Sequence, residues 1–307
     1  HLGPDKAYHV FTGRFPGTAA DEWSYADEVI RANAVESHVV EPNAQGFMDE
    51  LGEFMWLNEL PVGSSSQYAQ WCVFRLAKEH GVTVLLDGQG ADEILAGYEQ
   101  YFRNYLTTLT QSGEAARKGM EEPAIRARYP AALADTSENL KTRLPFRVRR
   151  ALAHLTNRGS DFRFGVATAV GGALGSSSEG FGDVPLLDAL NEDAFHAHLP
   201  TLLRYGDRNS MAHSREVRLP FCDHRLAEFV FSLPPHLLMG EVQTKRLLRE
   251  SMRGILPEEV RTRWNKQGFR PPQDQWFQSE RMQACVKDTF SSTSFRQSAY
   301  WNAPWWE

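Results

Sequence analysis

The front of the chain alternates between strand and helix patterns, and this alternation restricts it to few architectures. Residues 7–12 and 37–42 read as short strands, and apolar residues recur at helical spacing between about 21 and 34. A second helix is predicted from about 67 to 80, followed by the apolar pattern VTVLL at 82–86. Strands that alternate with helices are typical of a parallel sheet covered by helices. We therefore predict an α/β fold with most of a doubly wound parallel sheet, in which VTVLL is a buried central strand.

The remainder of the chain has a different pattern. Helical periodicity dominates from about residue 101, and Pro and Gly separate the segments. The stretch 165–184 is rich in Gly and Ser, which predicts a mobile loop. We therefore expect one domain over 1–307. Its parts would be an α/β part at 1–110, a helical and mobile insert at 111–200, and a helical part at 201–307 that completes the site.

Composition excludes several classes of protein. The net charge of −6 argues against a general nucleic-acid surface, and no apolar run approaches the length of a membrane span. No signal peptide is visible, so we expect a cytoplasmic protein without a membrane partner. Cys72, Cys222 and Cys285 lack metal-like spacing and are expected to be reduced thiols. We assign no role to His38 or His213, since a lone histidine is usually structural.

The stretch VLLDGQGADEILAGY at 84–98 joins a strand pattern to a helix pattern through a glycine-rich turn. In open α/β sheets, ligands bind at such turns beyond the carboxyl ends of the strands. Gly88 and Gly90 allow the backbone to approach a ligand, and Asp92 can hold Mg²⁺ through a hard oxygen. A simpler explanation is that Asp92 and Glu93 only favour the first turn of a helix. The pattern alone leaves both explanations open.

Two further stretches combine charges with apolar residues. DRNSMAHSREVRLPFCDHRLAEF at 207–229 interleaves charges with Met211 and Phe221, which predicts charges that are partly buried and paired. A solvated helix face is the simpler explanation. In GEVQTKRLLRE at 240–250, Lys245 lies near the start of an amphipathic helix, where a positive charge opposes the helix dipole. Phosphate binding would explain this position, although a plain exposed lysine is the commoner case.

Taken together, these stretches resemble the carboxy-terminal synthetase domain of the asparagine synthetase family. The stretch at 84–98 is similar to that family's V-L-L-S-G-E/D-G-x-D-E-x-x-x-G-Y. The stretch at 207–223 is similar to D-R-x-x-M-A-x-x-x-E-x-R-x-P-F-L-D, and TKRLLRE to the family's lysine-containing helix. FTGRFPG and ADEWSYA resemble the strand and helix after the family's first nucleotide loop. The resemblance covers about residues 8–110 and 200–275.

The resemblance implies a fold and a reaction. The family fold is a doubly wound sheet of the ATP-pyrophosphatase type with a helical lobe. Its members adenylate a carboxylate with release of pyrophosphate, and an amine then displaces AMP. By resemblance, Asp92 would bind Mg²⁺, and Lys245 would stabilise the pyrophosphate and the tetrahedral intermediate. ATP and Mg²⁺ are thus the expected cofactors.

Further residues match family positions. Gly13, Asp87 and Gly88 match positions that line the adenosine. Glu216 matches the glutamate that pairs with the catalytic side chain in the β-lactam-forming branch. Gln89 occupies a position where asparagine synthetases often have Glu and β-lactam-forming relatives have Tyr. A neutral amide cannot accept a proton from an incoming amine, although it can still orient that amine.

Other departures concern what the chain lacks. The family's Ser-Gly-Gly-x-Asp-Ser loop and its amino-terminal glutaminase domain are absent. We infer that His1 is not the natural start, and we expect the chain as printed to be inactive alone. The stretch LPVGSSSQY also lacks the arginine that asparagine synthetases often place near Val62 to meet aspartate.

The resemblance therefore implies a glutamine-hydrolysing, asparagine-synthetase-like amide ligase. Aspartate is the default carboxylate, ammonia would come from a glutaminase domain, and a homodimer is possible. One alternative is a relative that amidates or cyclises another carboxylate in glycan or peptide biosynthesis. Another is a non-catalytic homologue that only binds a nucleotide or a partner.

Overall fold

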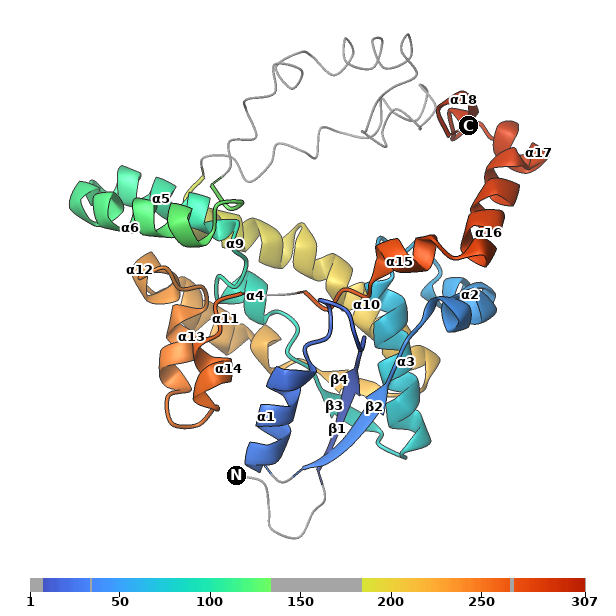
Figure 1. Cartoon of the computed structure of the whole chain (residues 1–307). Helices are drawn as coiled ribbons and strands as arrows, with labels where there is room; N and C mark the ends of the chain where they lie inside the picture. Colours follow the sequence, from blue (N-terminus) through green and yellow to red (C-terminus); the bar gives the residue numbers. More distant parts are fainter. Residues whose placement is uncertain (1–7, 34, 134–183, 266–267, 307) are drawn as a thin grey trace. The chain divides into compact units, whose positions relative to one another are not determined.

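A computed structural model describes residues 8–33, 35–133, 184–265 and 268–306 (Figure 1). The described residues form two compact units, one of residues 8–133 and 184–276 and one of residues 277–306. The loop predicted at 165–184 lies outside the described residues except for Val184. None of the helices in the described part of the chain is both long and apolar enough to cross a membrane.

The larger unit begins with β1 (His9–Gly13), α1 (Trp23–Asn33), β2 (Glu36–Val40), α2 (Ala44–Asn58), α3 (Ser66–Glu79), β3 (Val84–Leu86), α4 (Ala91–Ile94), α5 (Tyr101–Gln111) and α6 (Ala115–Arg128). It continues with α9 (Leu186–Phe195), α10 (His198–Ala212), β4 (Glu216–Arg218), the 3-10 turn η3 (Pro220–Cys222), α11 (His224–Phe231), α12 (Pro235–Leu238), α13 (Arg246–Ser251) and α14 (Glu258–Thr262). Helix α15 (Gln273–Phe277) ends one residue past the last residue of this unit. The smaller unit contains α16 (Glu280–Ser291), α17 (Thr293–Arg296) and α18 (Ala303–Trp306).

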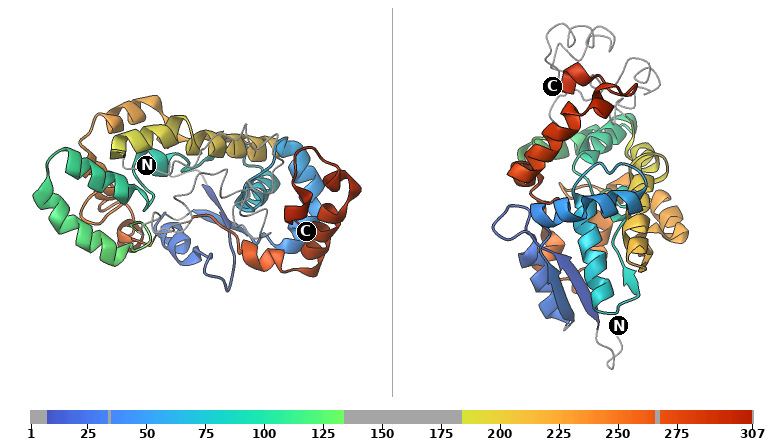
Figure 2. Two further views of the ribbon diagram at one scale, coloured as in Figure 1. Left: turned by 90° about the horizontal axis from the view of Figure 1, so that it is seen from above. Right: turned by 90° about the vertical axis from the view of Figure 1, so that its right-hand side faces the viewer.

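The strands β1 and β2 form a parallel pair, as the strand–helix–strand pattern predicts. Helix α3 packs against both strands and lies beside them in both views (Figures 1 and 2). The face of α3 that carries Tyr68, Trp71 and Cys72 is buried, and Gly81 follows the helix with a φ of 72°. Phe54 from α2 completes this core, which we call the sheet-side core. The predicted strands and helices of this region are therefore confirmed to within a few residues.

The strand β3 pairs in parallel with β4, and among the described strands it has no other partner. Val84 is 40% exposed and Leu86 is 75% exposed. The prediction of a buried central strand is therefore wrong. A three-residue strand with one neighbour leaves its second edge and much of its side-chain surface open to solvent. The described strands form two separate parallel pairs, so α/β architecture is confirmed, whereas a single doubly wound sheet is not shown.

Helices α4, α5, α6, α9, α11 and α12 enclose a second core, which we call the helical core. Tyr101, Phe102 and Tyr105 on one face of α5 are fully buried in it. Helix α10 contributes to both cores, because Leu199 lies in the helical core and Ala212 packs against the sheet-side core. A single helix thus connects the two hydrophobic centres of the larger unit.

The smaller unit is held together by aromatic side chains. The ring of Phe295 packs at 5.0 Å from Phe290 and at 6.0 Å from Trp301, measured between ring centroids. Trp306 lies 5.0 Å from Phe290. Such aromatic clusters stabilise small helical units because each ring buries a large apolar area.

Candidate functional site

The glycine-rich turn lies directly beyond the end of β3. The backbone N–H of Asp87 donates to the carbonyl of Arg218 at 3.0 Å, which extends the β3–β4 ladder to this residue. The Asp87 carboxylate then accepts the backbone N–H of Gln89 at 3.2 Å and fixes the turn. Gly90 has a φ of 91°, and a Cβ there would lie 2.6 Å from the sulfur of Cys222. This position therefore requires glycine for both conformation and space.

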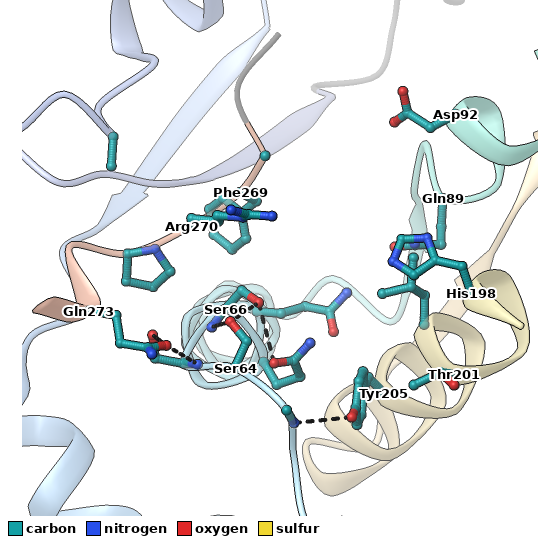
Figure 3. Close-up of a pocket in the computed structure, with 18 of the residues that line it drawn as sticks. Ser64, Ser66, Gln89, Asp92, His198, Thr201, Tyr205, Phe269, Arg270 and Gln273 are labelled. Carbon is teal, nitrogen blue, oxygen red and sulfur yellow. Dashed lines mark hydrogen bonds between the residues drawn. The ribbon is translucent and has the colours of Figure 1, made fainter. Parts of the chain in front are cut away.

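A cavity of about 1020 Å³ opens beside this turn. Its lining comes from five parts of the larger unit, namely residues 18–20, the 63–70 region, the 87–98 turn, one face of α10 and the segment 268–275. In Figure 3, Gln89 and His198 lie on one side of the cavity, while Phe269 and Arg270 lie on the opposite side. The position beyond a strand's carboxyl end agrees with the sequence-based expectation.

Hydrogen bonds tie the serine-rich loop before α3 to its surroundings. The N–H of Gly63 donates to the hydroxyl oxygen of Tyr205 at 3.1 Å (Figure 3). The backbone N–H and the hydroxyl of Ser65 both donate to the side-chain oxygen of Gln273, at 3.1 and 2.9 Å. These hydrogen bonds hold one wall of the cavity against α10 and α15.

Of the predicted site residues, Asp87, Gly88, Gln89 and Asp92 line the cavity. Lys245 is not among the lining residues, but its ammonium nitrogen lies 2.9 Å from a carboxylate oxygen of Asp92. Lys245 precedes α13 as its N-cap residue, as predicted, with a left-handed φ of 50°. The structure therefore brings the two expected phosphate and metal residues together.

Two predicted residues lie elsewhere. Gly13 ends β1 outside the lining, and a Cβ there would lie 2.9 Å from the ring of Phe269, which does line the cavity. Glu216 begins β4, is exposed, and accepts a hydrogen bond at 2.7 Å from Arg218 on the same face of the strand. Some charges of this stretch are paired, as predicted, but the Glu216–Arg218 pair is exposed rather than partly buried.

Sequence reasoning did not identify His198, which lines the cavity at the start of α10. Its Nδ1 lies 3.0 Å from a carboxylate oxygen of Glu93, and the Tyr98 hydroxyl donates to the same oxygen at 2.5 Å. Glu93 is only 1% exposed. Burial raises the pKa of this carboxyl, but the hydrogen bonds from His198 and Tyr98 outweigh burial and bring the pKa below its usual value. A buried carboxylate thus orients a cavity histidine.

This arrangement could have been anticipated only in part. Glu93 and Tyr98 belong to the 84–98 stretch, but His198 lies 105 positions away from Glu93 along the chain. A histidine at the start of a helix carries no local signal that a carboxylate will contact it. Only the packing of α10 against the helical core brings the two together.

The cavity also offers hard oxygen ligands. The carboxylates of Asp87 and Asp92 both line it, and carboxylate oxygens are the ligands that Mg²⁺ prefers. Burial raises the pKa of Asp87, while backbone hydrogen bonds from Gln89 and Gly88 oppose that shift. A buried carboxyl whose ionised form is disfavoured gains from a nearby cation. The chemistry of these two residues therefore fits a divalent ion.

A comparison with family models identifies the family to which the chain belongs. The model of the family described as asparagine synthase matches residues 4–305. The chain belongs to the asparagine synthase family. This confirms the resemblance carried by the three sequence motifs, and it places the cavity with Asp92 and Lys245 in an asparagine synthase domain.

Individual relatives of this asparagine synthase domain have different names. Asparagine synthetase [glutamine-hydrolyzing] 1 of Bacillus subtilis is 27% identical over 287 residues, covering 88% of this chain and 43% of the relative. Amidase chyE of Penicillium rubens is 26% identical over 301 residues, covering 87% of this chain and 44% of that protein. The chain therefore spans less than half the length of these relatives.

Proposed function

We propose that this asparagine synthase domain forms an amide in two steps, by adenylating a carboxylate with ATP and then transferring an amine to it. The observation that carries the proposal is the Asp92–Lys245 pair beside a large cavity at the end of β3. The carboxylate oxygen attacks the α-phosphorus of ATP, and the bond to the pyrophosphate oxygen breaks. The amine nitrogen then attacks the acyl carbon, and AMP leaves with the bond electrons.

Different residues would have different roles in this reaction. Lys245 would neutralise charge that develops on the departing pyrophosphate, because a fixed cation near a transferring phosphoryl group lowers the barrier. Asp92, with Asp87 from the lining of the same cavity, would hold Mg²⁺, which when bound neutralises phosphate charge. The backbone of the turn at Gly88 would lie against the nucleotide, and Gly13 would keep β1 from crowding it. We also propose that the strands belong to a doubly wound parallel sheet of the ATP-pyrophosphatase type.

The proton of the attacking amine needs an acceptor, and Gln89 cannot provide one. His198 lies on the same side of the cavity as Gln89 (Figure 3), and buried Glu93 holds its Nδ1. A carboxylate that engages one ring nitrogen fixes the tautomer, so that the other nitrogen can accept a proton. We assign this acceptor role to His198. Glu216, which is exposed beside Arg218, would act on the site through β4 rather than by contact.

The carboxylate substrate remains a choice between two classes. Aspartate is the default, and one relative is named as a glutamine-hydrolysing asparagine synthetase. Gln89, together with Val62 in place of an arginine, favours a different carboxylate, and another relative is named as an amidase. We propose ammonia, released from glutamine by a separate domain of the natural protein, as the amine in either case.

The test measures pyrophosphate and amide formation separately. The natural protein is supplied with ATP, Mg²⁺, ammonium and a panel of carboxylates that includes aspartate. Asp92→Asn and Lys245→Ala should each lower pyrophosphate release at least about 100-fold, as loss of electrostatic stabilisation typically does. His198→Gln should retain pyrophosphate release and slow amide formation.

The control is Lys118→Ala, because Lys118 is not part of the cavity lining and its ammonium group donates to the Thr110 hydroxyl of α5 at 2.9 Å. It should leave both rates unchanged. Unchanged pyrophosphate release in both Asp92→Asn and Lys245→Ala would refute the residue roles. Absence of pyrophosphate release with every carboxylate would favour a non-catalytic nucleotide-binding homologue instead.

A further inference from the structure

Three side chains of types that can ligate metal ions lie close together on β1 and β2, outside the lining of the cavity. In the parallel register His9 is the partner of Glu36, and Phe11 is the partner of His38. Because side chains alternate between the two faces of a strand, His9, Glu36 and His38 point to one face of this strand pair. No local sequence pattern connects these residues, since 29 positions separate the two histidines.

The distances within this group match those of ligands around one small ion. His9 Nδ1 lies 2.8 Å from His38 Nε2. One carboxylate oxygen of Glu36 lies 3.6 Å from His9 Nδ1, and the other lies 3.6 Å from His38 Nε2. Around a tetrahedral Zn²⁺ with bonds of roughly 2.0–2.1 Å, neighbouring ligand atoms are about 3.3 Å apart. The three separations bracket this value, so small side-chain adjustments suffice to place an ion between them.

The surroundings prepare the two imidazoles for such an ion. His38 is 9% exposed, and its ring packs 3.6 Å from the ring of His80 at the end of α3, measured between centroids. Phe11, the register partner of His38 on the same face, stacks on the His38 ring with 5.1 Å between the centroids. These contacts restrict the orientation of the ring before any ion binds. Glu36, which is 56% exposed, leaves a route from solvent and room for a fourth ligand.

We propose that His9, His38 and Glu36 bind one divalent ion of the zinc class. Two imidazole nitrogens with one carboxylate form a donor set that suits zinc and its neighbours in the first transition series rather than Mg²⁺ or Ca²⁺. The site lies at the amino ends of β1 and β2, whereas Asp92 lies beyond the carboxyl end of β3. The ion would join the two strands where they begin, independently of the proposed ligase chemistry.

The test uses the 307-residue chain after removal of metals with a chelator. Titration with Zn²⁺ should show one site per chain, and Co²⁺ in its place should give the strong visible absorption of a tetrahedral complex. Since loss of an outer-shell partner alone costs about 10–100-fold in affinity, removal of a direct ligand in His9→Ala should weaken binding at least about 100-fold. Glu36→Gln changes an exposed side chain and should weaken binding without affecting the fold, which circular dichroism verifies.

Two controls separate this site from other binding. His224→Ala alters an exposed histidine that lies 3.9 Å from the Asp223 carboxylate, and it should leave Zn²⁺ affinity unchanged. Asp92→Asn should also bind Zn²⁺ normally, so that failure of the ligase proposal and failure of this one are distinguishable. Equal affinity in the His9→Ala, Glu36→Gln and unaltered chains would overturn the proposal. So would the absence of a tetrahedral Co²⁺ spectrum.

Discussion

At the scale of single residues, the ion pair between Asp92 and Lys245 depends on a glycine. A Cβ on Gly97 would lie 1.8 Å from a carboxylate oxygen of Asp92 and 2.4 Å from Cε of Lys245. The backbone N–H of Lys245 also donates to the carbonyl of Ala96 at 3.1 Å. The Asp92–Lys245 pair therefore lies directly against the backbone of residues 96–97, and position 97 has no space for a side chain.

Gly97→Ala should separate activity from folding. The added methyl group must displace Asp92, Lys245 or both, and misplacement of such groups by about 1 Å can cost roughly 100-fold in rate. We expect pyrophosphate release by the natural protein to fall at least about tenfold, with the thermal unfolding curve retained as a single transition. Gly119→Ala, in a helix position with no atom within 4 Å of the new Cβ, is the matched control. Normal activity in Gly97→Ala would contradict the role given to the pair.

His213 links stability to pH. It is buried beside Trp71, with 4.5 Å between the ring centroids, and its Nε2 has no hydrogen-bond partner in the described residues. Burial, and secondarily the positive charges of Arg75 and Lys78, lower the pKa of His213 to about 4. The unfolded state, with a pKa near 6.5, binds the proton more readily, so the folded state loses stability as pH falls from about 6.5 towards 4.

The loss should amount to about 1–3 kcal/mol in the free energy of unfolding by pH 4, since one pKa unit corresponds to about 1.4 kcal/mol. Urea unfolding of the chain between pH 7 and 4 measures it. His213→Phe keeps an aromatic ring beside Trp71 and removes the titrating group, so its stability should fall less over the same range. Parallel curves for the two proteins would show that other groups cause the acid loss.

At the scale of elements, the sequence predicted best where patterns are long. The helix expected at about 67–80 is α3, Ser66–Glu79, because its apolar face recurs over several turns. The short strand β4 was missed, since Glu216 and Arg218 carry charge and only Val217 is apolar. Its pairing with β3 depends on contacts across more than a hundred residues. Likewise, the position of His198 beside Glu93 follows from tertiary packing and not from any local pattern.

The buried asparagine of α10 explains how this helix is placed. Asn209 is fully buried, and its amide nitrogen donates to the carbonyl of Gln67 at 3.0 Å and to the side-chain oxygen of Gln70 at 2.9 Å. Its side-chain oxygen accepts from Asn58 at 3.1 Å. One side chain therefore connects α10 to both α2 and α3, and Gln67 and Gln70 both line the cavity.

Asn209→Ala should lower the free energy of unfolding by about 2–3 kcal/mol, because it leaves the buried Asn58 amide and Gln67 carbonyl without this partner. Chemical denaturation of the chain measures the change. Asn33→Ala is the comparison, since Asn33 is exposed and its side chain donates to the Val29 carbonyl one turn earlier in α1 at 2.8 Å. Its effect should stay within about 0.5 kcal/mol, as is usual for surface positions. Equal losses in the two variants would mean that Asn209 does not anchor the helix.

At the scale of the larger unit, the cavity lies where the two cores approach each other along α10. Gln67 and Gln70 on α3 bring it next to the sheet-side core, while Glu93 and Tyr98 bring it next to the helical core. Tyr205 on α10 lies between these groups and bonds to Gly63. A ligand in the cavity would therefore contact residues next to both cores, to each of which α10 contributes.

Nucleotide binding should consequently stabilise the unit as a whole. A ligand at about 100 times its Kd adds about 2.7 kcal/mol to the folded state, which for a domain of this size corresponds to a rise in Tm of roughly 5 °C. Calorimetry of the natural protein with saturating ATP and Mg²⁺ measures this rise. In Lys245→Ala the shift should shrink, because the Asp92 carboxylate then faces the phosphates without its compensating cation. In Lys118→Ala the full shift should persist. A shift of equal size in all three proteins would place the nucleotide outside the cavity that Asp92 and Lys245 border.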